Sequence, residues 1–431
     1  MTTTAEICVI GAGAGGAAAC RALALRGLSF DCYERKPAVG GLWRYGAEGA
    51  PGCAYASLCS NTSRAVMQFP SFPMPERYPH YPHHALVARY LDAYVDHWSL
   101  RDRIRFGTEV TALQPSPGGG WEVRLADGSR HRYRAAVVAS GARHGEPVDA
   151  QIAGDFDGRA LHAFDYHDPA PFAGQRVLVV GLGATSADIA PELARVAATT
   201  CLSVRTGHYV LPKLFLGHPV DEVSPLVRRL SPEARRPLVQ LLLRLANGKP
   251  AQQGLPKPPY APGRGPLIAT TELLPAIAHG RVSVKPHPLR ADGRRVRFAD
   301  GSADEFDAII HCTGYRIKFP FLDHAILAGG DDAPPLYHLA ASPEHADLYV
   351  VGLAHSMTAF PPIAEAQADW VADVIAGAVQ LPSRAEMWAT IRHARRRQDR
   401  RFHDSSGHLL IDVEEYVRMI ARERRRHAVA A

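Results

Sequence analysis

The segment Ile7-Cys-Val-Ile-Gly-Ala-Gly-Ala-Gly-Gly16 contains the pattern Gly11-x-Gly13-x-x-Gly16 between an apolar run and an alanine-rich stretch that extends to Arg26. In the dinucleotide-binding fold the first glycine permits a tight turn, the second lets the backbone approach a pyrophosphate, and the third allows close helix packing. The start of the helix then offers free N–H groups and a positive dipole to the phosphates. The segment therefore predicts a strand, a turn and a helix that bind a dinucleotide.

A second copy of this pattern follows about 170 residues later. The stretch Val177-Leu-Val-Val-Gly-Leu-Gly-Ala-Thr-Ser186 again joins an apolar run to Gly181 and Gly183, with serine in place of the third glycine. The hairpin sequence Val-Arg-Leu-Ala-Asp-Gly-Ser at 123–129 has the counterpart Val-Arg-Phe-Ala-Asp-Gly-Ser at 296–302, and a buried strand ending in glycine is expected after each. The repeat predicts an α/β chain with two related, Rossmann-like dinucleotide-binding domains.

The residue at the end of the second predicted strand distinguishes the two units. Glu34 lies about 20 residues beyond Gly11, where a carboxylate accepts hydrogen bonds from ribose hydroxyls and repels a 2′-phosphate. Arg205 has the corresponding position in the second unit, with Thr206 beside it, and a guanidinium attracts a 2′-phosphate. The first site is therefore predicted to bind FAD or NAD, and the second NADP(H).

The composition bounds the class of protein. The 431 residues suffice for two or three domains, and 46% hydrophobic with 21% charged residues exclude a disordered or fibrous chain. No apolar run approaches the ~18 residues of a spanning helix and no secretory signal is recognised, so we expect a soluble, cytoplasmic protein with no membrane contact. Most of the net charge of +6 comes from residues 384–427, where twelve arginines accompany seven acidic residues, so we expect no nucleic-acid partner.

Two groups of reactive residues suggest other chemistry. Cys53 and Cys59 form a redox dithiol only if they approach each other, but they are not a close pair in the sequence and nothing nearby supplies a base, which favours unpaired thiols. His80, His83 and His84 form the densest histidine group, but no carboxylate or thiol joins them at ligand spacing. We therefore expect a solvated helix entry at these histidines and no metal site.

The segment between the two units carries the pattern Phe156-x-Gly158-x-x-x-His162-x-x-x-Tyr166. It resembles the FxGxxxHxxx(Y/F) signature of class B flavin-dependent monooxygenases, and its final aromatic residue is that of the flavin-containing monooxygenase (FMO) family. Baeyer–Villiger enzymes of the first type usually carry tryptophan there. We expect His162 to fix the linker between the units rather than to act as a general base.

Further motifs extend this resemblance over nearly the whole chain and occur in the family's order. They are the second FAD glycine motif Gly40-Gly-Leu-Trp43, the Asn-Thr-Ser segment at 61–63, the linker His311-Cys-Thr-Gly-Tyr315, the final strand at 348–353 and the flavin-facing helix at 365–370. The chain departs from the family at Ala184, Thr185 and Ser186, where Asn-Ser-Gly is usual.

The resemblance implies a discontinuous FAD-binding domain of residues 1–168 and 310–431, into which an NADP-binding domain of residues 169–309 is inserted. It implies that NADPH reduces FAD, that O2 then gives a C4a-hydroperoxyflavin, and that a soft nitrogen or sulfur nucleophile of a small-molecule substrate attacks the distal oxygen. The implied cofactors are FAD and NADP(H), and exclusion of water matters more than side-chain acid–base chemistry. The sequence leaves open whether the protein is a homodimer.

Asn61 is the residue expected to act in catalysis. A neutral amide donates and accepts hydrogen bonds without supplying the proton that would discharge the hydroperoxide. Arg44 is a further candidate for a contact with the FAD phosphates. The residues expected to bind the cofactors are Gly11, Gly13, Gly16, Glu34, Gly40, Gly41, Leu42, Trp43, Asn61, Thr62, Gly181, Gly183, Thr185, Ser186, Arg205, Thr206, Thr313 and Gln367.

Three alternative functions remain at this point. The first is Baeyer–Villiger oxygenation beside a ketone, which Tyr166 and Asn61 disfavour without excluding it. The second is an uncoupled NADPH oxidase that releases H2O2. The third is a redox-sensing flavoprotein that reports the nicotinamide state to a partner, which the complete series of motifs disfavours.

Overall fold

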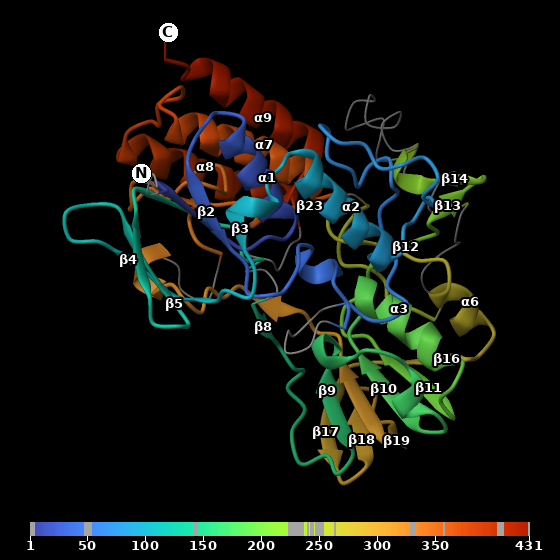
Figure 1. Cartoon of the computed structure of the whole chain (residues 1–431). Helices are drawn as coiled ribbons and strands as arrows, with labels where there is room; N and C mark the ends of the chain where they lie inside the picture. The colour runs from blue at the N-terminus through green and yellow to red at the C-terminus, as the bar shows by residue number, and fades with distance from the viewer. Residues whose placement is uncertain are drawn as a thin grey trace.

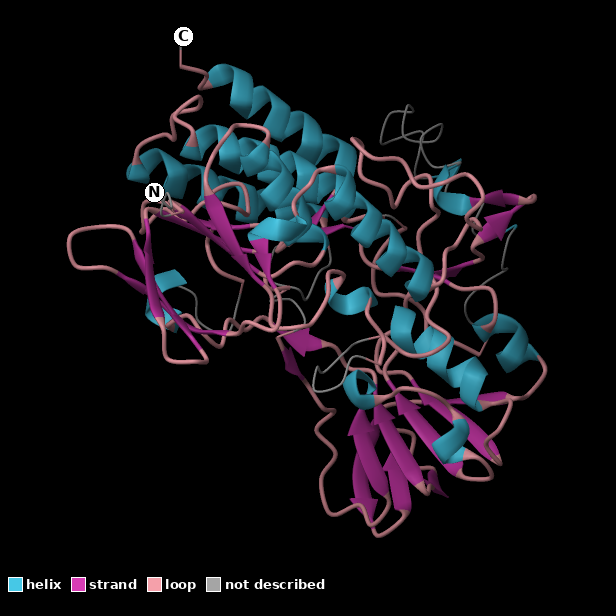
Figure 2. Ribbon diagram, viewed as in Figure 1, coloured by secondary structure: helices cyan, strands magenta, loops and turns pink. Residues whose placement is uncertain are grey.

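The computed structural model describes residues 5–46, 54–141, 145–222, 254–262, 264–327, 333–356, 358–402 and 409–429, together with positions 237, 238, 241 and 245. The described residues form two α/β units, each built on its own parallel sheet. In Figure 1 the sheet that contains β2 and β3 and the sheet that contains β9, β10 and β11 lie in separate parts of the molecule. Helices accompany both sheets (Figure 2).

The first unit has a five-stranded parallel sheet in the order β22-β7-β1-β2-β3. Its strands are β1 (Ile7–Ile10), β2 (Phe30–Tyr33), β3 (Ile104–Arg105), β7 (Ala135–Val138) and β22 (Leu348–Val350). The register aligns Ile7 with Phe30 on one side and with Ala135 on the other. Because β22 is supplied by residues 348–350, sequence from the last third of the chain completes the sheet.

The second unit repeats this topology in the order β16-β11-β10-β20-β9. Its strands are β9 (Arg159–His162), β10 (Arg176–Val180), β11 (Thr199–Ser203), β16 (Val282–Lys285) and β20 (Ala308–His311). Strand β10 takes the place of β1, β11 that of β2, and β20 that of β7. The repeat inferred from the sequence is thereby confirmed.

The repeated hairpins also match each other. The first unit has the antiparallel sheet β4 (Val110–Pro115), β5 (Trp121–Leu125) and β6 (Arg130–Tyr133), and the second has β17 (Pro288–Asp292), β18 (Arg295–Phe298) and β19 (Ala303–Glu305). Gly128 and Gly301, with φ of 85° and 83°, lie in the two hairpin turns. The preceding aspartates accept hydrogen bonds from the backbone two residues on, as Asx-turns do.

Each parallel sheet is buried on both faces. In β1, Ile7 and Val9 point to one core while Cys8 and Ile10 point to another. The same alternation divides the residues of β10 between two cores. Continuous apolar strands of this kind are expected where both faces of a parallel sheet are covered. The covers are helices on one face and the three-stranded sheet on the other.

The helices of the first unit pack residues from the end of the chain against residues from its beginning. Helix α1 (Ala14–Ala24) packs on α7 (Pro361–Ile375), and α7 packs on α9 (Val413–Arg426). Asp373 of α7 pairs with Arg26 just beyond α1 and with Arg424 of α9, each at 2.6 Å. These pairs are partly buried and hold three helices to one another.

The remaining elements are shorter or lie at the edges. They are α2 (His84–His97), α3 (Ala184–Leu193), α6 (Leu273–Ala278), α8 (Arg384–Arg401), β8 (Glu146–Pro147) with β21 (Tyr315–Arg316), β12 (Tyr209–Leu211) with β15 (Leu267–Ala269), β13 (Leu214–Phe215) with β14 (His218–Pro219), β23 (His355–Ser356) with β24 (Leu410–Ile411), and the 3-10 turns η1 (Gly41–Trp43), η2 (Arg101–Arg103), η4 (Ala163–Asp165), η5 (Ala170–Phe172) and η7 (His324–Leu327).

Strand β9 bears on the predicted boundary between the domains. The boundary at residue 169 assigns residues 159–162 to the first domain, yet β9 pairs with β20 in the second sheet. Strand β20 ends at His311, just beyond the predicted end at 309. The insertion itself remains a prediction, and the strand pairing favours limits near 159 and 311.

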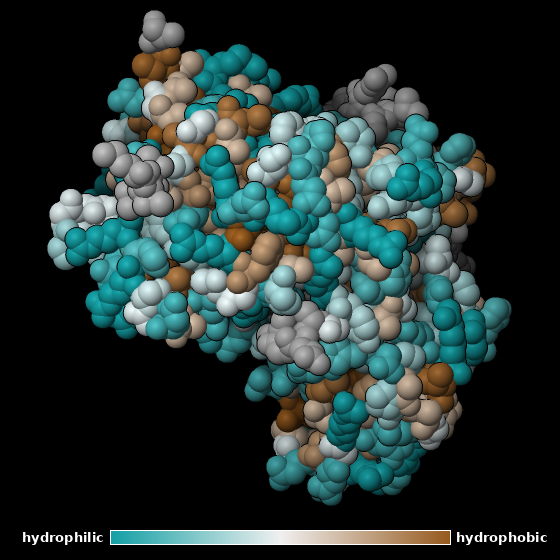
Figure 3. All heavy atoms as spheres, in the orientation of Figure 1, coloured by the Kyte–Doolittle hydropathy of each residue, from teal (hydrophilic) through white to brown (hydrophobic). Residues whose placement is uncertain are grey.

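The surface offers no segment suited to span a bilayer among the described residues, where no helix is both long and apolar enough. On the face seen in Figure 3, hydrophilic side chains cover most of the area and hydrophobic atoms occur in scattered patches. Scattered patches are normal for a protein surface.

We predict that Gly16→Ala destabilises the first unit, because the added methyl group overlaps the carbonyl oxygen of Gly11. Overpacking of this kind costs about 1–3 kcal/mol. Chemical unfolding followed by circular dichroism measures the loss. Gly183→Ala is the matched control, since a methyl group there meets open space. Equal stability of the two variants would contradict the proposed packing.

Candidate active site

The first glycine fingerprint forms the turn between β1 and α1. Gly11 has φ of 99°, and a Cβ atom on it would lie 2.7 Å from the carbonyl oxygen of Ala139 beyond β7. The contact of Gly16 with the Gly11 carbonyl brings the helix against the turn. Helix α1 begins after Gly13 without a side-chain cap and with no acidic residue in its first turn. Its first N–H groups are therefore suited to an anion.

The second glycine motif packs directly on the first. A Cβ atom on Gly41 would lie 3.1 Å from the Cα atom of Gly13, and the Gly40 N–H donates a 3.2 Å hydrogen bond to the first turn. The turn η1 leaves Leu42 36% exposed and packs Trp43 against the core. The two motifs together form a backbone surface with few side chains, which suits a close approach by a phosphate.

Arg44 follows this motif but is engaged elsewhere. Its Nε atom donates to the carbonyl of Val39 at 2.6 Å, and its guanidinium forms an ion pair with Asp92 of α2. Both interactions are within the protein. They argue against the expected contact of Arg44 with the FAD phosphates.

Glu34 directly follows β2, near the first fingerprint. Its carboxylate accepts hydrogen bonds from the N–H groups of Ala12 at 2.6 Å and Lys36 at 2.8 Å, and the residue is only 6% exposed. These bonds fix the carboxylate near the fingerprint turn. Each oxygen keeps a lone pair that a ribose hydroxyl can use.

The second fingerprint has the same turn but a different helix start. Gly181 has φ of 109°, and a Cβ atom on it would lie 2.6 Å from the carbonyl oxygen of Cys312. Ser186 is fully buried, and its hydroxyl accepts a 2.8 Å hydrogen bond from the Gly183 N–H. The structure accommodates the side chain of Ser186 at the third glycine position, whereas even a methyl group overlaps the turn at Gly16. The half-buried Thr185 completes this first turn.

The cation predicted to select NADP(H) lies beyond β11. Arg205 is exposed, and Thr206 beside it is half-buried. Burial lowers the pKa of His287, and the charge of Arg205 lowers it further, so the two side chains are neighbours. A Cβ atom on Gly183 would meet no atom within 4 Å. The second fingerprint thus combines open space with an exposed cation, whereas the first has a buried carboxylate.

Asn61 lies in the loop Ser60–Ser63, and its Oδ1 atom is buried. This oxygen has no hydrogen-bond partner among the described residues. The hydroxyl of Thr62 donates a 3.0 Å hydrogen bond to the carbonyl of Thr358, just before α7. A buried polar atom without a partner costs free energy, and native structures retain few of them. The Asn61 oxygen is therefore a candidate for a contact with a bound molecule.

The signature segment attaches the linker to the second unit. Phe156 bridges to Gly293 and packs on the second unit's core, and a Cβ atom on Gly158 would lie 2.5 Å from the Phe156 ring. The buried Tyr166 donates a 2.7 Å hydrogen bond to Glu192 of α3. These three signature residues form packing and linker contacts.

His162 and Thr313 lie where the chain crosses between the units. The Nδ1 atom of His162 accepts a 3.0 Å hydrogen bond from the Phe164 N–H, and its ring packs edge-on against Tyr315. Burial lowers the pKa of His162, which favours the neutral ring at neutral pH. The Thr313 hydroxyl donates to the carbonyl of Val148. The arrangement fits a linker role for His162 rather than that of a general base.

Gln367 is buried and hydrogen-bonded within the protein. It is 0% exposed in α7, where Oε1 accepts from the Gly352 N–H at 3.1 Å and Nε2 donates to the Leu339 carbonyl at 3.3 Å and the Tyr416 hydroxyl at 2.8 Å. Both donor hydrogens are used within the protein. These hydrogen bonds give Gln367 a packing role between α7 and α9, and its cofactor contact stays a prediction.

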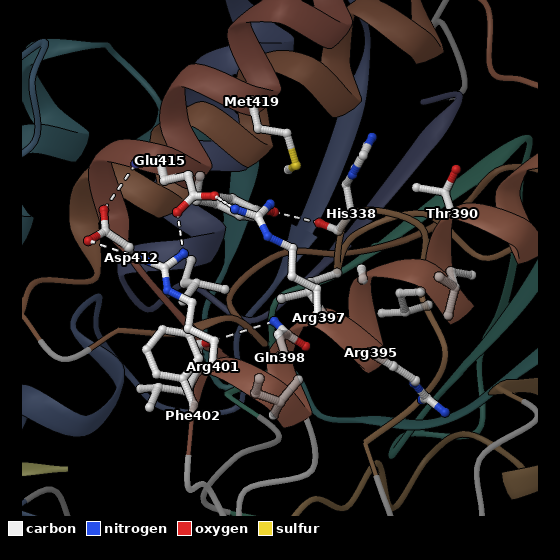
Figure 4. Close-up of a pocket in the computed structure, with 18 of the residues that line it drawn as sticks. His338, Thr390, Arg395, Arg397, Gln398, Arg401, Phe402, Asp412, Glu415 and Met419 are labelled. Carbon is white, nitrogen blue, oxygen red and sulfur yellow. Dashed lines mark hydrogen bonds and ion pairs between the residues drawn. The ribbon is translucent and has the colours of Figure 1, made fainter. Parts of the chain in front are cut away.

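Tyr416 also borders a cavity of about 270 Å³ between α8, α9 and β24. In Figure 4, Arg397 and Arg401 both extend to Glu415, with which they form ion pairs. None of the residues that line the cavity belongs to the set predicted to bind cofactors. The cavity is therefore separate from the predicted cofactor sites.

His83 and Cys59, which the sequence singled out, have surroundings that fit structural roles rather than metal binding or redox chemistry. His83 caps α2 by accepting from the Ala85 N–H at 3.3 Å. Burial raises the pKa of Cys59, which keeps it protonated at neutral pH, unlike a redox-active thiolate. Cys53 lies outside the described residues. Within the described part of the chain, no group of three or more His, Cys, Asp or Glu residues is arranged to hold a metal ion.

Two charged residues at the Asn61 loop were missed by sequence reasoning. Lys213 donates to the Ser60 carbonyl, and Asp221 accepts from the Ser63 N–H. Both belong to the stretch beyond β12, where no recognised motif occurs. The only local signal is the apolar neighbourhood of Lys213, which is too common to identify a site.

Comparison with known proteins identifies the family. A family model described as flavin-binding monooxygenase-like matches residues 4–423. Flavin-containing monooxygenase 3 of Rattus norvegicus is 32% identical over 403 residues, covering 89% of this chain and 76% of that protein. Flavin-containing monooxygenase 5 of Homo sapiens is 30% identical over 431 residues, covering 95% of this chain and 80% of that protein.

Solved structures have the same fold. The S-allyl-L-cysteine S-oxygenase from Allium sativum superposes with a TM-score of 0.74 at 24% identity, covering 99% of this chain and 90% of the other. The open crystal structure of cyclohexanone monooxygenase superposes with a TM-score of 0.73 at 19% identity, covering 98% of both chains.

The chain belongs to the flavin-binding monooxygenase-like family. It is a flavin-dependent monooxygenase with two dinucleotide-binding domains, and its cofactors are FAD and NADPH. Oxygenation at nitrogen or sulfur, the main reaction expected from the sequence, fits this family.

The described residues fit both cofactors. The uncapped start of α1, the side-chain-poor surface of the two glycine motifs and the buried carboxylate of Glu34 suit FAD. The open space at Gly183 and the exposed Arg205 suit NADPH. The orphaned oxygen of Asn61 suits a group bound between them.

We predict that Gln367→Leu lowers the free energy of unfolding by about 1–3 kcal/mol, because it leaves buried polar groups unpaired. If Gln367 packs rather than binds, the FAD content and the NADPH KM of the folded variant stay unchanged. Urea unfolding and the absorbance of bound flavin measure the two effects. Loss of FAD from a variant of wild-type stability would instead assign Gln367 a contact with the cofactor.

Proposed function

We propose that this monooxygenase oxygenates a nitrogen or sulfur centre of a small molecule at a site around Asn61. The observation that carries the proposal is the buried, unpartnered amide oxygen in the Ser60–Ser63 loop. This loop contacts the start of α7 on one side, through Thr62, and the second unit on the other, through Lys213. A loop in contact with both units would lie within reach of cofactors bound to each of them.

The overall reaction consumes the substrate, NADPH, a proton and O2, and gives the oxygenated substrate, NADP+ and water. Bound FAD supplies the chemistry, since it takes the hydride from NADPH and passes electrons to O2. The protein orients both cofactors and excludes water, because early loss of the activated oxygen as H2O2 wastes the NADPH. Asn61 suits this role, since its amide offers hydrogen bonds without an acidic proton.

We assign the two cofactors to the two units by charge. Glu34 of the first unit favours an unphosphorylated ribose, as in FAD, and repels a 2′-phosphate. Arg205 of the second unit attracts the 2′-phosphate of NADPH, with Thr206 as a neighbouring hydroxyl donor. The N-termini of α1 and α3 would hold the two pyrophosphates when the cofactors bind. The FAD domain is discontinuous in this assignment, and the NADP domain is inserted into it.

The remaining contacts proposed for the cofactors follow the two glycine-rich motifs and the linker. The residues are Gly11, Gly13, Gly16, Gly40, Gly41, Leu42, Trp43, Thr62, Gly181, Gly183, Thr185, Ser186 and Thr313.

We further propose that the protein acts in the cytoplasm on a freely diffusing substrate, as a homodimer. Size-exclusion chromatography with light scattering tests the oligomeric state.

Ketone oxygenation is a second candidate reaction, because the chain shares its fold with cyclohexanone monooxygenase. A panel of tertiary amines, thioethers and cyclic ketones separates the two reactions. Oxygen uptake coupled to an N-oxide or S-oxide supports the proposal. If an ester or lactone is the only product whose formation is coupled to oxygen uptake, ketone oxygenation replaces the proposed reaction. If every compound gives only H2O2, the protein is an NADPH oxidase.

We predict that Asn61→Ala binds FAD and is reduced by NADPH but loses about tenfold in product formed per NADPH consumed. The missing product is replaced by H2O2. Product, NADPH and peroxide are measured in the same reaction. Gln114→Ala, which shortens an exposed amide in β4, is the matched control and keeps the wild-type ratio. An unchanged product yield in Asn61→Ala would show that another residue has this role.

We predict that Arg205→Ala raises the KM for NADPH by about 10- to 100-fold and hardly changes the KM for NADH, because it removes a charge-assisted contact to the 2′-phosphate. Steady-state kinetics with both nucleotides measure this. Arg281→Ala removes another exposed arginine of the same unit and serves as the control. Equal losses for NADPH and NADH would contradict the placement of the 2′-phosphate.

A further inference from the structure

The loop that carries Asn61 is held at both ends by one segment of the second unit. The Nζ atom of Lys213 donates a 3.2 Å hydrogen bond to the carbonyl of Ser60, directly before Asn61. Asp221 accepts a 2.7 Å hydrogen bond from the N–H of Ser63 through its Oδ2 atom. The two hydrogen bonds therefore bracket Asn61 and Thr62.

The hairpin β13–β14 sets the spacing of these two groups. Strands β13 and β14 pair antiparallel, and the Val220 N–H donates a 3.0 Å hydrogen bond to the Lys213 carbonyl at the base of the hairpin. This pairing brings Lys213 beside the residue that precedes Asp221. Leu216 at the tip is 85% exposed, so the hairpin meets the first unit through its base.

Of the two charged side chains at the base of the hairpin, Lys213 is buried and Asp221 is half-buried. Lys213 is only 9% exposed, and its ammonium group lies 5.3 Å from the centre of the Tyr81 ring. The Tyr81 hydroxyl donates in turn to the Lys213 carbonyl. Burial raises the pKa of Asp221, which reflects the cost of its charge there. Burying charged groups is expensive unless hydrogen bonds compensate, and here both side chains bind the backbone of the Asn61 loop. The second carboxylate oxygen of Asp221, Oδ1, is buried without a partner among the described residues.

Lys213 also connects the loop to the helix of the second fingerprint. Asp188 of α3 accepts a 2.6 Å hydrogen bond from the Tyr55 hydroxyl. Burial raises the pKa of Asp188, and the charge of Lys213 opposes this rise, so the ammonium lies within electrostatic reach. Asp188 lies two residues after Ser186, in the turn that follows the dinucleotide fingerprint.

We propose that Lys213 and Asp221 form a clamp that positions Asn61, so that the second unit controls how much activated oxygen reaches the substrate. The proposal rests on the function assigned to Asn61 above. Lys213 and Asp221 are positioning residues, since they contact the loop backbone rather than the substrate. Weakening the clamp favours the uncoupled reaction, in which NADPH, a proton and O2 give NADP+ and H2O2.

The clamp is tested by the ratio of oxygenated product to H2O2 formed per NADPH, with an amine or thioether substrate. Lys213→Met and Asp221→Ala each remove one hydrogen bond and are expected to lower the product fraction by about tenfold. FAD content and the rate of anaerobic flavin reduction by NADPH are expected to stay within about twofold of the wild type. A merely destabilised protein loses FAD and reduction rate as well.

Conservative variants separate the hydrogen bonds from packing. Lys213→Arg keeps a donor for the Ser60 carbonyl, and Asp221→Asn keeps an acceptor for the Ser63 N–H, so both are expected to recover most of the product fraction. Lys257→Met and Asp292→Asn change exposed residues of the second unit and serve as controls. A wild-type product fraction in Lys213→Met and Asp221→Ala would overturn the clamp, as would equal losses in the controls.

Combination with Asn61→Ala distinguishes failure of the clamp from failure of the proposed function. If the clamp acts through Asn61, Lys213→Met in the Asn61→Ala background lowers the product fraction no further. Additive losses would overturn the clamp while leaving Asn61 in its role. A wild-type product fraction in Asn61→Ala alone would instead refute the function proposed for Asn61, whatever the clamp variants do.

Discussion

Helix α1 approaches the end of strand β1 so closely that only glycine fits at residue 16. This contact places an uncapped helix start over the carboxyl end of the sheet, where backbone N–H groups and the helix dipole favour phosphate. The second glycine motif then packs on the first through Gly41, and Glu34 is held beside both. The FAD site that we propose for the first unit therefore depends on one backbone contact that tolerates no side chain.

The second unit uses the same topology with a looser version of this contact. Ser186 fills the third glycine position, and its hydroxyl takes up the Gly183 N–H, a donor near the helix start. The two fingerprints thus share one topology but differ in the groups at the start of the helix. The buried Glu34 and the exposed Arg205 follow equivalent strands, and the proposed choice of ribose by each unit rests on this change of charge.

The loop that carries Asn61 is held by both units. The Ser60–Ser63 loop comes from the first unit, yet its two ends bind Lys213 and Asp221 of the second. The signature segment similarly leaves the first unit and contributes β9 to the second sheet. Beyond β9, Tyr166 binds Glu192 of α3. The position of Asn61 is thus fixed by contacts from both units.

The sequence by itself determined the two fingerprints, the repeat, the difference between Glu34 and Arg205, and the family, because short-range patterns of glycine and charge carry each of them. Tertiary structure alone decided that Gln367 packs inside α7, that Arg44 pairs with Asp92, and that β9 joins the second sheet. It also decided the partners of the Asn61 loop. Those contacts join residues separated by tens to hundreds of positions. The local spacing of residues does not indicate which distant group will complete a hydrogen bond.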